Sequence, residues 1–171
     1  PQSRRPAACG PALSALSTRI PAMQLLPPLN ELGKKKAYRF NLGTQVSVSK
    51  SWFKELNIRT LGHNPPSSGM KTDMDSLNQC LNDAGQSPET ILKIVIFDKD
   101  DYEFAKEIAA KYPSLPLYLQ PGNPQTEGDA DNEALNARMR WLVENVTKDK
   151  WFSATILPQL HVTLWGNQRG V

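Results

Sequence analysis

The fold of this chain is decided by residues 91–97, which read Ile91-Leu92-Lys93-Ile94-Val95-Ile96-Phe97. This run is almost continuously apolar and rich in β-branched side chains, which favour strands. Nearly unbroken apolar strands are typical of parallel sheets, because helices cover both faces of such sheets. We therefore expect residues 91–97 to form a strand that is buried on both faces.

Segments on either side of this strand alternate between helical and strand-like patterns. Apolar residues three or four apart predict a helix capped by Thr72 and closed by Gly85, with Cys80 as a buried structural thiol. A second helix begins in an acidic turn after residue 97 and ends before Pro113. Further strands are expected at 37–42, 58–61, 115–120 and 155–157, and a long helix has an inward stripe of Leu135, Met139, Leu142, Val143 and Val146. This alternation predicts an α/β domain with a mostly parallel sheet and right-handed crossovers.

Binding sites in parallel sheets lie in the loops that follow the carboxyl ends of strands. Three loops of the chain have this position: residues 43–45, 62–69 and 120–123. Gly, Pro, Asn and Ser also make ordinary turns, so spacing alone leaves open whether each loop is functional.

Composition sets limits on the function. The 171 residues fit one domain, and 39% apolar residues with a mean hydropathy of −0.47 are typical of a soluble globular protein. A net charge of +3 is too small to predict nucleic-acid binding. No apolar run reaches the roughly 18 residues of a membrane span, and we expect a cytoplasmic protein without a membrane partner. Residues 1–28 hold six of the fourteen prolines and are expected to be an irregular, disordered leader; an organellar leader is the alternative.

The usual motifs of nucleotide, hydrolase and metal sites are absent from the sequence. There is no GxGxxG, GxxxxGK[ST] or HExxH pattern, and no GxSxG surrounds Ser67 and Ser68. Cys9 and Cys80 lie far apart, so neither a disulfide nor a cysteine-ligated metal can be assigned. His161 has apolar neighbours, which favours a buried, hydrogen-bonded histidine over a catalytic one. The closing stretch, residues 158–171, is expected to pack against the molecule as a strand or a tight helix.

Several segments together resemble one family, the 7-carboxy-7-deazaguanine synthases, which are radical S-adenosylmethionine enzymes of the deazapurine pathway. The resemblance covers residues 29–171. The segments that carry it are FNLGTQ at 40–45, PPSSGM at 65–70, KIVIF at 93–97, LPLYLQPGN at 115–123 and ILPQLHVTLWGNQRGV at 156–171.

The resemblance implies an incomplete (β/α) barrel of the radical S-adenosylmethionine type, over residues 29–171, in a homodimer. It implies a [4Fe-4S] cluster that cleaves S-adenosylmethionine to a 5′-deoxyadenosyl radical. That radical starts the contraction of 6-carboxy-5,6,7,8-tetrahydropterin to 7-carboxy-7-deazaguanine, with Mg²⁺ near the substrate and loss of ammonia, so the reaction is that of a carbon–nitrogen lyase.

Matching positions imply roles for individual residues. Thr44 and Val171 would contact the pterin, and Gln120, Pro121, Gly122 and Asn123 would line the S-adenosylmethionine site. Gly62, His63 and Asn64 stand where the family has Ser-Pro-Lys, at a cofactor contact that includes a lysine. Gly43-Thr44-Gln45-Val46 replaces the family's Glu-Thr-Gln-Gly. No catalytic residue and no metal ligand can be assigned in this way.

The cysteine loop that holds the cluster in the family has no counterpart in this sequence. Cys9 alone cannot supply the three thiolates that such a cluster needs. Ligands for Mg²⁺ are not found either. We therefore expect that the chain does not catalyse the reaction alone. The alternative is a non-catalytic, truncated α/β module that pairs with an intact synthase.

Overall fold

The computed structural model describes residues 31–33, 35–46, 49–70, 73–84, 89–125 and 127–168. Several predictions lie outside these residues: the leader at 1–28, the cap Thr72, the closing Gly85, and Val171.

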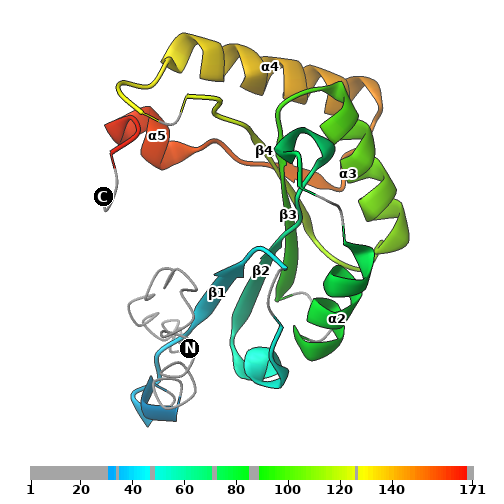
Figure 1. Ribbon diagram of the computed structural model, residues 1–171, viewed down its shortest axis with the longest axis vertical. Helices are drawn as coiled ribbons and strands as arrows, with labels where there is room; N and C mark the ends of the chain where they lie inside the picture. The colour runs from blue at the N-terminus through cyan, green and yellow to red at the C-terminus, as the bar shows by residue number, and fades with distance from the viewer. Residues whose placement is uncertain are drawn as a thin grey trace, which may run out of the picture.

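One curved parallel sheet organises the described chain (Figure 1). Its five strands lie side by side in sequence order: β1 (Asn41–Thr44), β2 (Ile58–Gly62), β3 (Thr90–Ile96), β4 (Leu117–Pro121) and β5 (Ala154–Ile156). All four neighbouring pairs are parallel. Sequential order in a parallel sheet requires every crossover to run on the same side, as in a (β/α) barrel. The predicted α/β class and parallel sheet are confirmed.

The helices cover the outer side of this curved sheet (Figure 1). They are α2 (Met74–Ala84), α3 (Lys99–Lys111) and α4 (Asn132–Lys148), with short 3₁₀ turns η1 (Ser51–Glu55) and η2 (Pro66–Ser68). A last helix, α5 (Leu160–Trp165), follows β5, and its end lies against residues 128–130, which precede α4. The core lies between the sheet and these outer helices, where side chains such as Leu61, Ile94, Tyr102 and Leu142 are almost fully buried. None of the described helices is long and apolar enough to cross a membrane.

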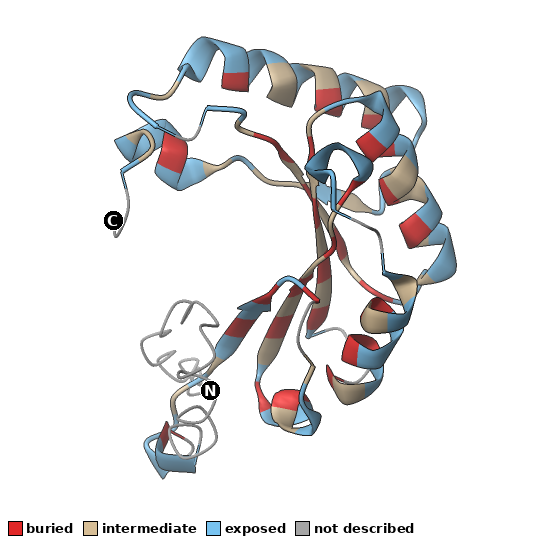
Figure 2. Cartoon of the chain, in the orientation of Figure 1, coloured by how far each residue is buried: buried red, intermediate tan, exposed pale blue. Residues whose placement is uncertain are grey.

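Burial alternates along the strands between buried and half-buried residues (Figure 2). Successive side chains of a strand point to opposite faces, so the buried ones face the outer helices and the half-buried ones face the inner, concave side. In β3, Leu92 and Ile94 are buried, whereas Lys93 and Val95 are half-buried. The prediction that residues 91–97 are buried on both faces is therefore wrong. The physical reason is that the helices pack only on the outer face, so the inner face stays accessible within the described chain.

Strand boundaries also differ from those predicted. The strand expected at 37–42 begins at Asn41, because Ala37 has a positive φ of 55° and the amide of Tyr38 bonds back to the carbonyl of Gly33. Gly43 and Thr44, expected in a loop, are the last residues of β1. Gly62 and Pro121 likewise end β2 and β4 rather than beginning loops.

Local signals explain where the helices begin. The side chain of Asp73 accepts hydrogen bonds from the amides of Asp75 and Ser76 before α2. The side chain of Asp98 accepts from the amide of Asp101 and caps α3. On α4, Leu135, Leu142 and Val146 are buried as predicted, Met139 is half-buried and Val143 is 42% exposed. Val143 follows Leu142 by 100° around the helix and so turns away from the sheet.

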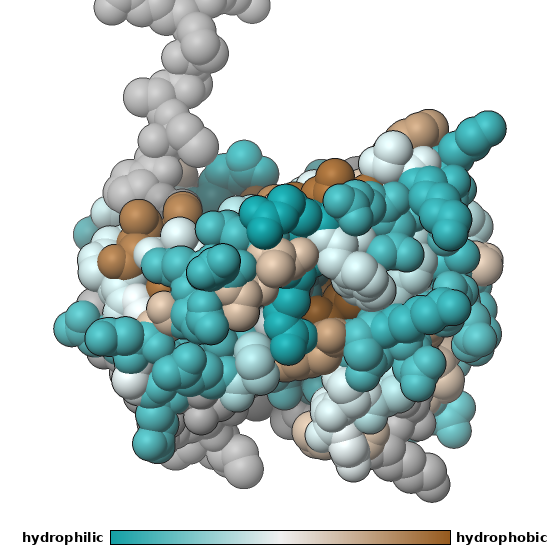
Figure 3. Space-filling model, turned by 90° about the horizontal axis from the view of Figure 1, so that it is seen from above, coloured by the Kyte–Doolittle hydropathy of each residue, from teal (hydrophilic) through white to brown (hydrophobic). Residues whose placement is uncertain are grey.

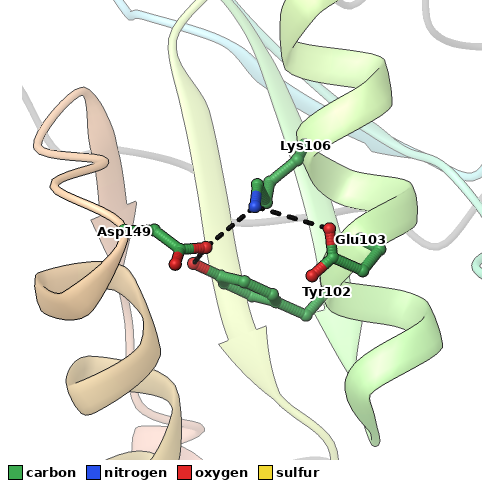
Figure 4. A network of polar contacts seen from close by, with 4 residues as sticks. All are labelled: Tyr102, Glu103, Lys106 and Asp149. Carbon is green, nitrogen blue, oxygen red and sulfur yellow. Dashed lines mark hydrogen bonds and ion pairs between the residues drawn. The ribbon is translucent and has the colours of Figure 1, made fainter.

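A polar network joins α3 to the end of α4 (Figure 4). The Tyr102 hydroxyl donates to Asp149 at 3.1 Å, and the Lys106 ammonium binds the same carboxylate at 2.8 Å and Glu103 at 3.4 Å. Burial, followed by the bond to Asp149, raises the pKa of Tyr102 to about 12. This network lies in the helix layer, and none of its residues belongs to a predicted loop. It fixes α3 against the end of α4.

The closing stretch is less buried than predicted. It forms a helix, α5, but only Val162 of this helix is buried, while Leu160, Leu164 and Trp165 are 60%, 57% and 51% exposed. His161 is exposed, so its prediction as a buried histidine is wrong. A helix of six residues can pack only one side against the molecule. Within the described chain, no other segment packs against its remaining sides. The face seen in Figure 3 is largely hydrophilic with small hydrophobic clusters.

Candidate functional site

A pocket of about 660 Å³ lies at the carboxyl ends of β1, β2 and β3. This is the edge at which parallel α/β sheets bind ligands. Two of the three predicted loops contribute to it, together with the inner face of β3. The lining residues are Gly43, Thr44, Gln45, Thr60, Gly62, His63, Asn64, Pro65, Ser68, Lys93, Val95 and Phe97.

A second pocket, of about 620 Å³, lies near the start of β4 and the residues that precede β5. It is lined by residues that include Lys106, Asp149 and Trp151. None of the residues assigned by resemblance lies in it. Because the amino edge of such sheets serves stability rather than chemistry, the first pocket is the candidate site.

Thr44 lines the pocket, but its side chain does not lie on the inner face. Thr44 is paired in register with Leu61, which is fully buried under the helices. Paired residues of parallel strands share a face, so the Thr44 side chain points into the helix layer. Gly43 and Gln45, on either side of it, are exposed and belong to the inner face. A Cβ built on Gly43 meets nothing within 4 Å, so the open space beside this strand is real.

His63 also lines the pocket, and its ring lies in the helix layer. The ring is 4% exposed and stacks on Phe104 of α3, with 5.4 Å between ring centroids. Burial lowers the pKa of His63, and neither ring nitrogen has a hydrogen-bond partner within the described chain. The imidazole is therefore neutral near pH 7. The sequence predicted the loop at 62–69, but it did not indicate on which face of the sheet the His63 ring lies.

The loop at 120–123 lies beside the pocket, at the end of β4, and is held by the closing stretch. The Gln120 side chain donates to the carbonyl of Pro158 at 3.1 Å, and Asn123 donates to Asn167 at 2.8 Å. A Cβ added to Gly122 would lie 2.5 Å from the ring of Phe97, a pocket residue. Glycine is thus required because the Phe97 ring covers it, and this contact joins the two groups of predicted residues.

The PPSSGM segment has a structural anchor in Asp101 of α3. This carboxylate is fully buried and accepts hydrogen bonds from the Ser67 amide (2.9 Å), the Ser67 hydroxyl (2.6 Å) and the Phe97 amide (2.9 Å). Ser68 Oγ in turn bonds to the carbonyl of Pro65 at 2.6 Å. Asp101 therefore fixes η2 and the end of β3, which form one wall of the pocket. The sequence suggested only a charge that favours the helix dipole here.

The described residues do not fit an iron–sulfur cluster or a bound metal ion. Within this part of the chain, no three His, Cys, Asp or Glu residues are grouped so that they could hold a metal. Cys80 is fully buried in α2, and its Sγ lies 3.7 Å from the carbonyl of Val46. Desolvation raises the pKa of this thiol, which disfavours the thiolate that a cluster requires. Cys80 is a structural thiol, as predicted.

Comparison with known proteins agrees with the motifs. The 7-carboxy-7-deazaguanine synthase of Bacillus subtilis (strain 168) is 38% identical over 149 residues, which are 82% of this chain and 61% of the relative. The synthase of the same name from Bacillus cereus (strain ATCC 14579) is 36% identical over 143 residues, 81% of this chain and 59% of the relative. The chain is similar to 7-carboxy-7-deazaguanine synthases. No family model matches the sequence.

The resemblance seen in the motifs is confirmed by these relatives. The chain spans about three fifths of the length of the synthases it matches. About two fifths of each relative lies outside the match, so the activity of the whole relative does not transfer with the similarity.

Proposed function

We propose that this chain forms part of a 7-carboxy-7-deazaguanine synthase barrel, and that its inner face binds S-adenosylmethionine and a carboxypterin. The observation that carries the proposal is the position of the pocket: it lies at the carboxyl edge of a parallel sheet that is open on its inner side. The identity of 38% to a synthase supports the same assignment.

S-adenosylmethionine would lie against the ends of β3 and β4. The ring of Phe97 offers a flat apolar surface against which a purine can stack. Gly122 packs beneath the Phe97 ring and holds it in place, and Asn123 presents an amide that its bond to Asn167 keeps in position. Gln120, Pro121, Gly122 and Asn123 remain the proposed S-adenosylmethionine residues. Gly62, His63 and Asn64 would contribute mainly backbone groups, together with the Asn64 amide.

The pterin would lie deeper, over the inner face of β1 and β2. Thr44 remains the proposed pterin contact, and its backbone would make this contact, because its side chain points into the helix layer. The neighbouring Gln45 and Thr60 carry the hydrogen-bonding side chains on this face, and pterin edges present complementary donors and acceptors.

When present, the [4Fe-4S] cluster of the family supplies an electron that cleaves S-adenosylmethionine. Because the described residues cannot hold it, we propose that the chain by itself binds ligands but does not turn over. Ring contraction of 6-carboxy-5,6,7,8-tetrahydropterin would require thiolates from beyond the described residues or from an intact synthase. Reducing conditions, as in the cytoplasm, suit this chemistry, and the cytoplasmic location and the homodimer stay predictions.

Calorimetric titration tests the binding part of the proposal. S-adenosylmethionine should bind the wild-type chain saturably, and Asn123→Ala should weaken binding several-fold because the loop loses its tie to Asn167. Asn136→Ala, on an exposed position of α4, should leave the affinity unchanged. Absence of any saturable binding by the wild type would refute the proposal. Product formed by the wild-type chain alone, after reconstitution with iron and sulfide, would refute the claim that it does not turn over.

A second candidate role is that of a module that pairs with an intact synthase. It is favoured by β1, which has a sheet neighbour on only one side in the described chain, and by the exposed Leu160, Leu164 and Trp165 of α5. Size-exclusion chromatography of the chain with an intact synthase separates the two roles. Co-elution favours pairing, and separate elution of two folded species excludes it.

A further inference from the structure

Lys93 is a cation placed in the middle of the inner face of the sheet. It is the fourth residue of β3 and alternates with Leu92 and Ile94, which point into the core. Its neighbours in register are Gly62 on β2 and Tyr118 on β4. Gly62 has no side chain, and a Cβ built there would lie 3.4–3.8 Å from Thr44 and Gln45, so Lys93 has a glycine on one side and the phenol of Tyr118 on the other.

The ammonium of Lys93 has no anionic partner in the described part of the chain. The ion pairs of Lys106 with Glu103 and Asp149, for example, lie on the helix layer and do not involve Lys93. Among the described residues that line the pocket, Lys93 is the only one with a charged side chain, because His63 is neutral and the others are polar or apolar. Desolvation alone lowers the pKa of Lys93, without an opposing carboxylate.

An unpaired, half-buried lysine is unfavourable for stability, and a purely structural role would place an apolar residue on this strand. Lysines that are taken out of water are normally paired with an anion or keep their ammonium in solvent. Lys93 lies inside a pocket of about 660 Å³ at the ligand-binding edge of the sheet. A missing anion is therefore best supplied by a ligand.

We propose that the Lys93 ammonium binds the carboxylate of the small molecule that occupies this pocket. The inference rests on the proposed function, which names two ligands with this group: the methionyl part of S-adenosylmethionine and the 6-carboxylate of the pterin. It deepens that function by naming the side chain that binds this carboxylate. Lys93 would then supply the positive charge that binds the carboxylate of the ligand.

The test compares ligands with and without the carboxylate. Dissociation constants are measured for S-adenosylmethionine against 5′-methylthioadenosine, and for 6-carboxypterin against pterin, with the wild type, Lys93→Met, Lys93→Arg and the exposed control Lys99→Met. Lys93→Met should weaken one carboxylate ligand by about 10- to 100-fold, the range for a hydrogen bond to a charged group. Its carboxylate-free counterpart should bind equally well to both proteins. Lys93→Arg should restore part of the affinity, and Lys99→Met should behave as wild type.

Each outcome supports or overturns the inference. A loss confined to S-adenosylmethionine assigns the methionyl carboxylate, and a loss confined to 6-carboxypterin assigns the pterin carboxylate. Equal affinity of wild type and Lys93→Met for both acids overturns the inference while the proposed function stands. Failure of the wild type to bind any of the four ligands overturns both. The melting temperature of Lys93→Met, expected to equal or exceed that of the wild type, shows that the variant is folded.

Discussion

Removal of the Asp101 carboxylate should destabilise the protein strongly. Asp101 is fully buried and accepts three hydrogen bonds, two from Ser67 and one from the amide of Phe97. In Asp101→Ala, two backbone amides and one hydroxyl lose their acceptor at the junction of α3, η2 and β3. A hydrogen bond to a charged group contributes about 1.5–3 kcal/mol, and part of this is recovered because water can reach the exposed Ser67. We therefore expect a loss of about 3–5 kcal/mol, a large part of the stability of a domain of this size.

Urea unfolding followed by circular dichroism measures this loss. Asp101→Asn keeps one acceptor oxygen and should lose about 1–3 kcal/mol, so the two variants should be ordered Ala below Asn below wild type. Asp100→Ala, at the exposed neighbouring position in the first turn of α3, is the matched control and should change the free energy of unfolding by about 0.5 kcal/mol or less. A loss below 1 kcal/mol for Asp101→Ala would show that the carboxylate does not hold the pocket wall as described.

Three further perturbations address the helix layer and the pocket rim. Gly122→Ala should destabilise by about 1–3 kcal/mol, because its Cβ would lie 2.5 Å from the Phe97 ring, and a fully neutral effect in urea unfolding would mean that this ring moves freely. The pKa of Tyr102 is raised to about 12, so the folded state keeps a proton that the unfolded state loses near pH 10. The melting temperature should therefore fall as the pH rises from 10 to 12. Tyr102→Phe should make this fall smaller, and the remainder belongs to other groups with raised pKa values, such as Tyr112. The pKa of His63 is lowered by burial, so the unfolded state takes up a proton first as the pH drops below about 6.5. The free energy of unfolding should therefore fall below that pH in the wild type, and fall less in His63→Gln. Parallel pH profiles of the two proteins would contradict the buried neutral ring.

The elements that sequence predicted best are those in which local pattern and burial agree. Ile94 and Leu92 belong to an apolar run that forms a central strand, and Cys80 lies on the apolar stripe of α2. Asp98 caps α3 through its own neighbour in sequence, Asp101. Such contacts are local, so the order of residues alone is sufficient to predict them.

The parts that sequence could not predict depend on residues far apart in the chain. Asp101 looks like one more acid in a first turn, but its partner Ser67 is 34 residues away. Lys93 interrupts an apolar run, and its place in the pocket depends on the strands that lie on either side of β3. The two histidines show the same limit: His63 in a polar loop is buried under α3, while His161 among apolar neighbours is exposed. The burial of a side chain depends on how the layers pack, not on the residues next to it in the sequence.

Amide chemical-shift mapping with S-adenosylmethionine tests most directly the claim that the inner face at the carboxyl edge is the binding site. The wild-type chain, labelled with ¹⁵N, is titrated and its shifts are followed residue by residue. We expect saturable shifts at Gly62, Lys93 and Gly122, and none at Asp149 or Trp151 beside the second pocket. Shifts confined to the second pocket, or no saturable shifts at all, would contradict the account.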